Sequence, residues 1–353
     1  MADKKVRIGF VGVGGMGQCA HLRNYVTVPN CEVVAIAELR EKTGQAVARR
    51  YGIAKVYRDH RDMLAHEKLD ALVAPQPFTR HGIVVKELAA AGLPIFTEKP
   101  LAAAIEVGQE ILQALAAGKA RHMVGYHKRS DPATRYAKAE IDRLKKTGEL
   151  GKMKYVRILM PAGDWVANGF HDLINCGDKP AEELRWDPPA SDMDEQTNKA
   201  YISFVNYYIH QVNLMRHLLG EPYRVTYADP SGVLLAGVSN GGVGCTIEMS
   251  PYVTTIDWQE SALVAFEHGY VKITLPAPLA SNRPGAVEVF RDPGGGKTPE
   301  VIHPQLPWVH AMRQQAINFV SFVLGEAPAP CEAAEALEDL KVAREYIRLW
   351  KGK

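Results

Sequence analysis

The chain has 353 residues, of which 46% are hydrophobic and 23% are charged, close to the average of globular proteins. This composition excludes a disordered chain, a collagen and a small disulfide-stapled protein. The 42 basic residues nearly balance the 40 acidic ones, and a net charge of +2 gives no electrostatic reason to expect a nucleic-acid partner. At roughly 150 residues per domain, the length predicts about two domains.

The spacing of the cysteines and the length of the apolar runs indicate where in the cell the protein is located. The five cysteines lie far apart and form no CxxC pair, so we expect no disulfide framework and no metal site. No stretch reaches the ~18 uncharged apolar residues of a membrane helix. The first residues also lack the apolar core of a signal peptide. Together these features predict a cytoplasmic protein without a membrane partner.

Strand and helix patterns alternate over the first 126 residues. Strands are expected at 6–11, 32–37, 69–74, 93–97 and 122–126, with helices at 16–26, 41–51, 81–91 and 105–117. This alternation is typical of βαβ units and a parallel sheet. We therefore predict an α/β fold in which residues 1–126 form a doubly wound, dinucleotide-binding Rossmann domain.

The pattern changes after Tyr126. Helices are expected at 134–146, 199–219, 309–324 and 333–350, and a long strand at 153–160, followed by an irregular, insertion-like segment at 162–196. Several β-rich runs between 225 and 274 have no helices between them, which is typical of an antiparallel sheet. Residues 127–353 are therefore predicted to form an α/β domain with a large, open, mostly antiparallel sheet. Its closing helices can pack back on the first domain.

A glycine-rich loop follows the first predicted strand. Gly12-Val13-Gly14-Gly15-Met16-Gly17 fits GxGxxG and opens a helix. The first glycine permits a tight turn, the second lets the backbone approach a pyrophosphate, and the third allows close helix–strand packing. The helix N-terminus adds N–H donors. The residues of this loop expected to contact the cofactor are Gly12, Gly14, Gly15, Met16 and Gly17.

Two residues after the second strand bear on the choice of cofactor. Glu38 lies about 20 positions after the loop, where an acidic residue accepts hydrogen bonds from the adenosine ribose and repels a 2′-phosphate. Arg40 can instead pair with such a phosphate. We expect NAD rather than NADP, with both residues at the cofactor.

The ends of the third and fourth strands supply further candidates. Glu98 and Lys99 precede a proline at the end of the fourth strand, and the carboxyl ends of parallel strands face the ligand crevice. The Lys99 ammonium can hydrogen-bond a substrate hydroxyl and favour its alkoxide. Pro77 and His81, after the third strand, are expected to form a wall beside the cofactor.

A polar stripe runs along the predicted helix at 199–219. Asn206, His210, Asn213 and His217 are spaced four, three and four residues apart, which places them on one helix face. Such a stripe either lines a cavity or holds hydrogen bonds within the core. The imidazole of His210 suits proton transfer near neutral pH, whereas His217 fits a helix C-terminus.

Together these residues resemble the Gfo/Idh/MocA family, the glucose–fructose oxidoreductase and inositol dehydrogenase group. The resemblance covers nearly the whole chain. It rests on Gly12–Gly17, Glu38, Pro77 with His81, Glu98-Lys99-Pro100-Leu101, Val124-Gly125-Tyr126, Arg129-Ser130-Asp131-Pro132 and the helix at 206–220.

The resemblance implies NAD(P)-dependent chemistry on sugars, polyols or their derivatives, usually in a dimer or tetramer. It places Lys99 beside the reacting hydroxyl. The family's Asp-x-x-x-His pattern falls on Asn206 and His210, so the histidine is kept while an asparagine replaces the aspartate. His127 stands where the family has an asparagine. The catalytic residues that we expect are therefore Lys99, His210 and Asn206.

The expected substrate is a small carbohydrate. Aromatic, amide and carboxylate side chains in the insertion-like segment suit a sugar ring, and the basic residues after the fifth strand suit an anionic substituent. The residues expected to contact the substrate are Tyr126, His127, Lys128, Arg129, Asp164, Trp165, His171, Arg185, Trp186 and Tyr207.

Three functions compete at this point. The leading one is an NAD-dependent dehydrogenase acting on a sugar, glycoside or polyol. The second is a redox-neutral glycoside hydrolase that oxidises its substrate transiently, eliminates the aglycone, adds water and reduces the ketone. The third is a nucleotide or sugar sensor without turnover, which the loss of the aspartate at Asn206 keeps open.

Overall fold

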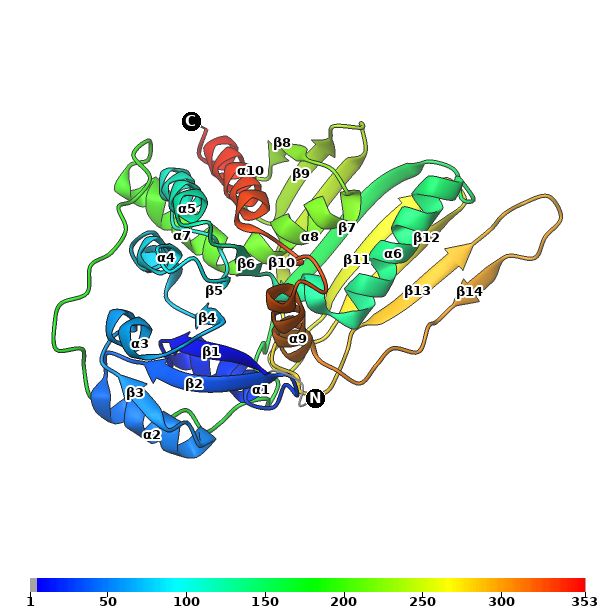
Figure 1. Ribbon diagram of the computed structural model, residues 1–353. Coiled ribbons are helices and arrows are strands. Elements are labelled where there is room, and N and C mark those ends of the chain that lie inside the picture. The colour runs from blue at the N-terminus through cyan, green and yellow to red at the C-terminus, as the bar shows by residue number, and fades with distance from the viewer. Residues whose placement is uncertain (1–4, 353) are drawn as a thin grey trace. The chain divides into compact units, whose positions relative to one another are not determined.

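A computed structural model describes residues 5–352 of the chain (Figure 1). They form two compact units. The first runs up to Tyr126 and adds Phe170–Met193 and Gln315–Leu337. The second takes His127–Gly169, Asp194–Gln314 and the remainder from Glu338. The expected domains, 1–126 and 127–353, are continuous in sequence, whereas two later segments belong to the first unit.

The first unit contains the predicted parallel sheet. Its strands lie side by side in the order β3-β2-β1-β4-β5-β6, the doubly wound order of dinucleotide-binding domains. They span β1 Val6–Val11, β2 Cys31–Ala37, β3 Lys55–Tyr57, β4 Ala71–Ala74, β5 Ile95–Glu98 and β6 His122–Gly125. All five pairings are parallel, which confirms the expected sheet. Only β3 was not predicted, because three residues are too few to show a pattern.

Helices connect these strands. Their bounds are η1 Gly17–Leu22, α1 Arg23–Tyr25, α2 Glu41–Tyr51, α3 His60–His66, η2 Phe78–Arg80, α4 His81–Ala89 and α5 Ile105–Gly118. The predicted helix at 16–26 is present, but η1 has π-helical hydrogen bonding, which is frequent near functional sites. No helix within residues 5–352 is long and apolar enough to cross a membrane.

An aromatic cluster holds the core of the first unit. Tyr25, fully buried, packs edge-on against Phe10 of β1, with ring centroids 5.4 Å apart. Phe319 of α9 (Ala311–Leu324) contacts both Tyr25 and Phe96 at 6.3 and 5.6 Å. A C-terminal helix thus supplies part of this core, as the sequence allowed.

The second unit contains an eight-stranded sheet. Its order is β14-β13-β12-β11-β7-β10-β9-β8, and only β7 and β10 pair in parallel. The strands are β7 Met153–Ala162, β8 Tyr223–Ala228, β9 Leu234–Ser239, β10 Gly244–Val253, β11 Glu260–Phe266, β12 Gly269–Leu275, β13 Ala286–Arg291 and β14 Glu300–Ile302. This confirms the predicted large, mostly antiparallel sheet.

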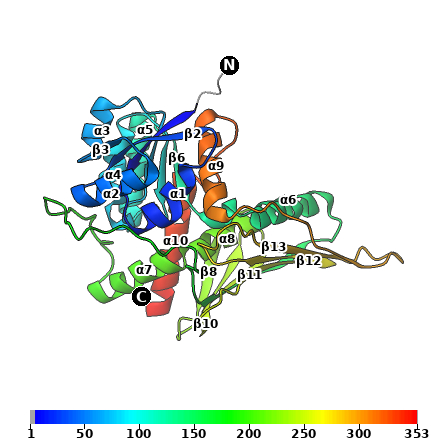
Figure 2. The ribbon, with the colours of Figure 1, turned by 90° about the horizontal axis from the view of Figure 1, so that it is seen from below.

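The helices of the second unit include η3 His127–Ser130, α6 Pro132–Thr147, α7 Glu195–Tyr207 and α8 Ile209–Leu219, and the chain closes with α10 Ala333–Lys351. Of these, α6 and α8 pack on one face of the sheet. Figure 2 shows α6 and α8 on the same side of the strands, in agreement with their contacts to β12 and β7.

The single helix expected at 199–219 is wrong, because the chain breaks it in two. Tyr208 separates α7 from α8 with φ −99° and ψ −3°, and its hydroxyl is 2.6 Å from that of Ser250. Asn206 therefore lies in the last turn of one helix and His210 in the first turn of the next. The prediction that Asn206 and His210 share one helix face assumed an unbroken helix, and the two residues lie in different helices.

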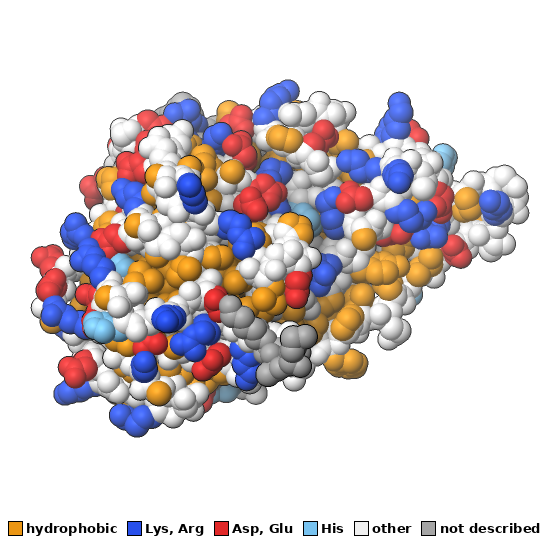
Figure 3. Space-filling model, in the orientation of Figure 1, with side chains coloured by type: hydrophobic (Ala, Val, Ile, Leu, Met, Phe, Trp, Pro, Cys, Tyr) orange, Lys and Arg blue, Asp and Glu red, His pale blue; other side chains and the backbone are white. Residues whose placement is uncertain are grey.

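Side chains of both charge signs are interspersed on the face shown in Figure 3. On the face shown in Figure 3, lysine and arginine side chains alternate with aspartate and glutamate, as expected from a net charge of +2. The other face of the second unit's sheet carries half-buried Leu159 and Leu263. The same face holds Arg157 and Glu248, whose side chains form two hydrogen bonds of 2.6 and 2.8 Å. This face is mixed rather than uniformly apolar.

Asp131 is a buried carboxyl group in the second unit. It caps α6 by accepting from the Ala133 amide at 2.8 Å, and it also accepts from the Gly285 amide at 3.0 Å. Burial raises the pKa of Asp131 to about 6, against an ordinary value of 3.8. The folded state therefore keeps a proton on Asp131 in a pH range where the unfolded chain releases it.

We predict that this proton makes stability fall as pH rises from 3.8 to about 6. Asp131→Asn keeps a capping side chain and removes the titration. Relative to this variant, the wild type should lose at most about 3 kcal/mol of unfolding free energy across that range. Denaturant unfolding of both proteins at each end of the range measures the difference. A constant difference would contradict the raised pKa.

Candidate functional site

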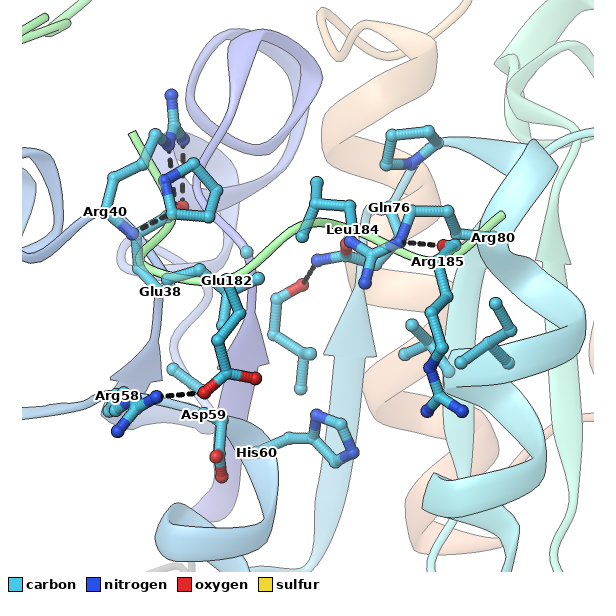
Figure 4. A pocket seen from close by; sticks show the side chains of 18 of the residues that line it. Glu38, Arg40, Arg58, Asp59, His60, Gln76, Arg80, Glu182, Leu184 and Arg185 are labelled. Atoms are coloured by element: carbon cyan, nitrogen blue, oxygen red, sulfur yellow. Dashed lines mark hydrogen bonds and ion pairs between the residues drawn. The ribbon is translucent and has the colours of Figure 1, made fainter. Parts of the chain in front are cut away.

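A cavity of about 410 Å³ lies at the carboxyl edge of the first unit's sheet (Figure 4). Its size is within the ordinary range for a small-molecule site. The loop after β1, the end of β2 and the turn after β4 line one side. Residues 180–185 line the other. These last residues belong to a segment that we call the strap, residues 170–193 of the first unit.

The glycines of the loop after β1 divide into two kinds. Gly12 has a φ of +94°, and a Cβ there would lie 2.1 Å from the Gln76 amide nitrogen. A Cβ on Gly17 would lie 2.9 Å from the Gly12 carbonyl oxygen. Gly14 and Gly15 have no described atom within 4 Å of such a Cβ. The protein's own packing therefore requires glycine at 12 and 17, while 14 and 15 leave open space for a ligand.

That open space fits a pyrophosphate. The loop leads into η1, which starts at Gly17 immediately after half-buried Met16. Backbone N–H groups at the start of a helix are donors suited to phosphate oxygens. The loop of residues 12–17, which we call the glycine cradle, therefore has the open space and the donors that a dinucleotide requires.

Glu38 connects this loop to the end of β2. One carboxylate oxygen accepts from the Val13 amide and from the Arg40 guanidinium, both at 2.9 Å. The other accepts from the Arg40 amide and Nε at 3.1 and 2.9 Å. Burial alone would raise the pKa of Glu38, but these hydrogen bonds outweigh it and hold the pKa below its ordinary value. An ionised carboxylate thus lies at the cavity, and Arg40 is bound to it.

Lys99 follows β5 at the same edge of the sheet. Along that edge the strands come in the order β2, β1, β4, β5, so Lys99 lies roughly 14 Å from Glu38, at ~4.8 Å per strand. Lys99 is half-buried and does not line the cavity. It is three strands along the edge from Glu38.

Glu98, expected at the cofactor, is buried and bonded within the protein. One oxygen lies 2.7 Å from Nε2 of His21, which belongs to η1, and the other accepts from the Lys99 amide at 3.1 Å. Burial would raise the pKa of Glu98, but the hydrogen bond from His21 helps to lower it. The helix after the glycine loop is thereby fastened to the residue that precedes Lys99.

The turn after β4 places Pro77 and His81 differently. Pro77 lines the cavity, as expected. His81 is fully buried, with its ring nitrogens 3.0 and 3.1 Å from the main-chain oxygens of Leu101 and Gln76. Burial lowers the pKa of His81. Its side chain therefore orders the turn and presents no surface to a ligand.

Several predicted residues of the second unit lie close together. The rings of His127 and His210 are in edge-to-face contact at 4.5 Å. The Lys128 ammonium is buried and paired with Glu260, and Arg129 donates to the Asn213 amide oxygen at 2.7 Å. Lys128 and Arg129 therefore take part in a buried polar network, which was not expected of residues proposed to hold an anionic substituent.

The remaining predicted residues of the second unit are more exposed. Asn206 and Tyr207 are exposed near the end of α7, and Tyr207 packs on Tyr208 with ring centroids 4.9 Å apart. Asp164 accepts from two amides of its own turn, and the neighbouring Trp165 is 43% exposed. Tyr126, by contrast, belongs to the first unit, as the last residue of its first segment, and it is buried.

The other expected substrate residues belong to the strap. His171, Arg185 and Trp186 were grouped with Asp164 in one insertion-like segment, but the structure divides this segment between the two units. Arg185 lines the cavity, and the Arg80 guanidinium lies 5.9 Å from the centre of the Trp186 ring. All three residues therefore belong to the first unit, where Arg185 lines the cavity and Trp186 packs on a residue that lines it.

Sequence reasoning missed several residues that shape the cavity. Arg58 and Glu182 form an ion pair from two sides of it, and Gln76 donates to the Val11 carbonyl oxygen at 2.7 Å (Figure 4). Only Gln76 had a local signal, because it directly precedes Pro77 at the end of a predicted strand.

Comparisons with known proteins agree with this architecture. Residues 6–126 match the GFO_IDH_MocA family, described as an oxidoreductase family with an NAD-binding Rossmann fold. The uncharacterized oxidoreductase YrbE of Bacillus subtilis (strain 168) is 22% identical, over 97% of this chain and 93% of its own. The scyllo-inositol 2-dehydrogenase (NAD(+)) of the same organism is 31% identical over 44% of each chain.

A solved structure shows the same fold over nearly the whole length. The WlbA dehydrogenase from Bordetella pertussis, in complex with NADH and UDP-GlcNAcA, aligns with a TM-score of 0.71 at 19% identity. The alignment covers 100% of this chain and 97% of that one. At this identity the likeness is one of fold.

We predict that Gly14→Val removes cofactor binding and leaves the fold intact. The valine would fill the open space above the loop, so the affinity for NAD should fall by about tenfold or more. Its melting temperature should match the wild type, because no described atom lies within 4 Å of the new Cβ. Calorimetric titration and thermal unfolding give the two readouts.

Gly17→Ala is the matched control. Its Cβ would lie 2.9 Å from the Gly12 carbonyl oxygen, so this variant should lose stability. Wild-type affinity for NAD in Gly14→Val would show that the pyrophosphate does not lie over the loop.

Proposed function

Because the chain belongs to the Gfo/Idh/MocA family of NAD(P)-binding oxidoreductases, we propose that it is an NAD-dependent dehydrogenase acting on a hydroxyl of a sugar, glycoside or polyol. The observation that carries this proposal is the carboxyl edge of the parallel sheet. It has an open glycine cradle after β1, an ionised Glu38 after β2 and Lys99 after β5. The first two are the features that hold a dinucleotide in such a domain, and Lys99 adds a cation further along the same edge. The inositol dehydrogenase among the relatives supports the substrate class.

Glu38 supports NAD over NADP. Its carboxylate suits the two ribose hydroxyls of NAD, whereas a 2′-phosphate would bring a second negative charge against it. Arg40, the cation that suits a phosphate, already forms hydrogen bonds with both oxygens of Glu38. The residues that would hold the cofactor are thus the loop glycines, Glu38 and Pro77.

The role proposed for Lys99 and His210 is to handle the proton of the substrate hydroxyl. When bound, nicotinamide supplies a hydride acceptor. Lys99, three strands along the edge from Glu38, is proposed to donate a hydrogen bond to the reacting oxygen as negative charge develops there. Imidazole is the side chain best suited to take the hydroxyl proton near neutral pH, which keeps His210 as the proposed base and Asn206 as its neighbour in sequence.

The first test is a panel of sugars, glycosides and polyols incubated with the purified protein and NAD. Growth of NADH absorbance with at least one of them is the expected result. Release of an aglycone without net NADH would contradict the dehydrogenase and indicate a redox-neutral hydrolase. Tight NAD binding with neither reaction across the panel would contradict catalysis on this substrate class.

Substitution of the two proposed catalytic residues provides a second test. Lys99→Ala and His210→Ala should each lower kcat about a hundredfold, the ordinary scale of a lost acid, base or oxyanion donor, with NAD affinity nearly unchanged. Lys86→Ala and His66→Ala remove a lysine and a histidine that form partly exposed ion pairs, and both should retain activity. Near-wild-type turnover in either catalytic variant would remove that residue from the mechanism.

We further propose that the chain forms a homodimer or homotetramer through the open face of the second unit's sheet. Leu159, Leu234, Val238 and Leu263 alternate there with buried residues of their strands and are half-buried. Large partly apolar faces mark interaction surfaces. Light scattering should therefore give a mass of at least two chains. A mass near 38.9 kDa would contradict it.

A further inference from the structure

The strap is held against the nucleotide-binding elements of the first unit by many polar contacts. Nε2 of the Gln18 side chain donates to the Ile174 carbonyl oxygen at 2.9 Å. The main-chain N–H of Ile174 donates back to Oε1 of Gln18 at 3.0 Å. Asp172 pairs with Arg50 at 3.1 Å. Figure 4 shows the strap crossing the cavity with the Glu182 side chain directed toward Arg58.

One strap residue, Asp178, caps a helix that lies far from it in sequence. α2 begins at Glu41, and the residue before it, Arg40, makes no side-chain cap. The Asp178 carboxylate accepts instead from the amides of Lys42 and Thr43 at 2.7 and 3.3 Å, and from the Thr43 hydroxyl at 2.6 Å. The hydrogen bond from the Thr43 hydroxyl leads the contributions that lower the pKa of Asp178, so its charge is fixed there.

The end of α2 that Asp178 caps lies beside Glu38, the residue proposed to select NAD. A Cβ on Gly44 would lie 3.1 Å from Cβ of Glu38, so the first turn of α2 packs directly on Glu38. Hydrogen bonding to Glu38 raises the pKa of Arg40, and the charge of Asp178 raises it further. Two carboxylates therefore act on the single guanidinium of Arg40.

A 2′-phosphate on a ribose at Glu38 would extend toward the first turn of α2, whose donors are bonded to Asp178. It extends from the ribose at Glu38 and carries a charge of about −1.5 to −2, which requires several donors. The free amides of a helix N-terminus are the donors best suited to it. Here two of these amides and a hydroxyl are already bonded to Asp178, and Arg40 is bonded to Glu38.

We propose that Asp178 is a specificity-determining residue that excludes NADP from the cofactor site. It fills the phosphate-binding donors of α2 with a fixed negative charge, and it is supplied by the strap rather than by the strand and helix that carry Glu38. The inference rests on the proposed function only in taking this cavity as the site of the adenosine ribose.

The test compares the binding of NAD and NADP to the full-length protein by calorimetry. Asp178→Asn keeps an oxygen to cap α2 and removes the charge, and Asp178→Ala removes both. In each variant the ratio of the NADP Kd to the NAD Kd should fall by about tenfold, the scale of one lost charge interaction at the site. Asp172→Asn is the matched control, because it weakens a strap contact with Arg50 in the last turn of α2, at the opposite end of the helix from Asp178, and should leave the ratio unchanged.

The outcomes are distinguishable. An unchanged ratio in both Asp178 variants, or an equal loss of affinity for the two cofactors, overturns the role of Asp178 and leaves the proposed dehydrogenase standing. A wild-type preference for NADP overturns the cofactor choice and this role together. Binding requires no substrate, so a changed ratio supports Asp178 even if no sugar in the panel is oxidised.

Discussion

The carboxylate of Glu38 joins the parts of the nucleotide site. Its hydrogen bond with the Val13 amide fixes the glycine-rich loop to the end of β2, and its bonds to Arg40 set the start of α2. Burial opposes a charge at this position, yet these donors keep it ionised. The loop, the ribose-binding position and the first turn of α2 are therefore parts of one hydrogen-bonded arrangement, which is why a change at any of them should alter cofactor binding.

A second buried contact extends this arrangement to the proposed reacting end. His21 lies in the helix that follows the glycine loop, and its ring is 2.7 Å from the Glu98 carboxylate beside Lys99. Both side chains are nearly inaccessible to water. The segment proposed to receive the pyrophosphate and the residue proposed to contact the substrate oxygen are thus connected within one unit, so binding at one can fix the other.

Local sequence patterns predicted the parallel sheet and the residues at its carboxyl edge. They did not predict the strap or the break between α7 and α8. The positions of the glycine loop, Glu38 and Lys99 at one edge of the sheet were predicted because each directly follows a buried strand, and parallel strands end at one edge. The strap was not found, because Asp178 and Glu182 are polar residues in an irregular segment whose partners lie more than 100 residues away. The break at Tyr208 was missed because the helical pattern continues through it and only a tertiary contact with Ser250 marks it.

We propose that a dinucleotide lies over the glycine-rich loop and beneath the strap. Hydrogen–deuterium exchange of the wild-type protein with and without NAD tests it most directly. We expect slower exchange at the amides of residues 12–17 and of strap residues 178–187, with β12 to β14 of the second unit as an internal reference that stays unchanged. Protection of the loop without the strap, or of neither, would show that the dinucleotide does not lie between them.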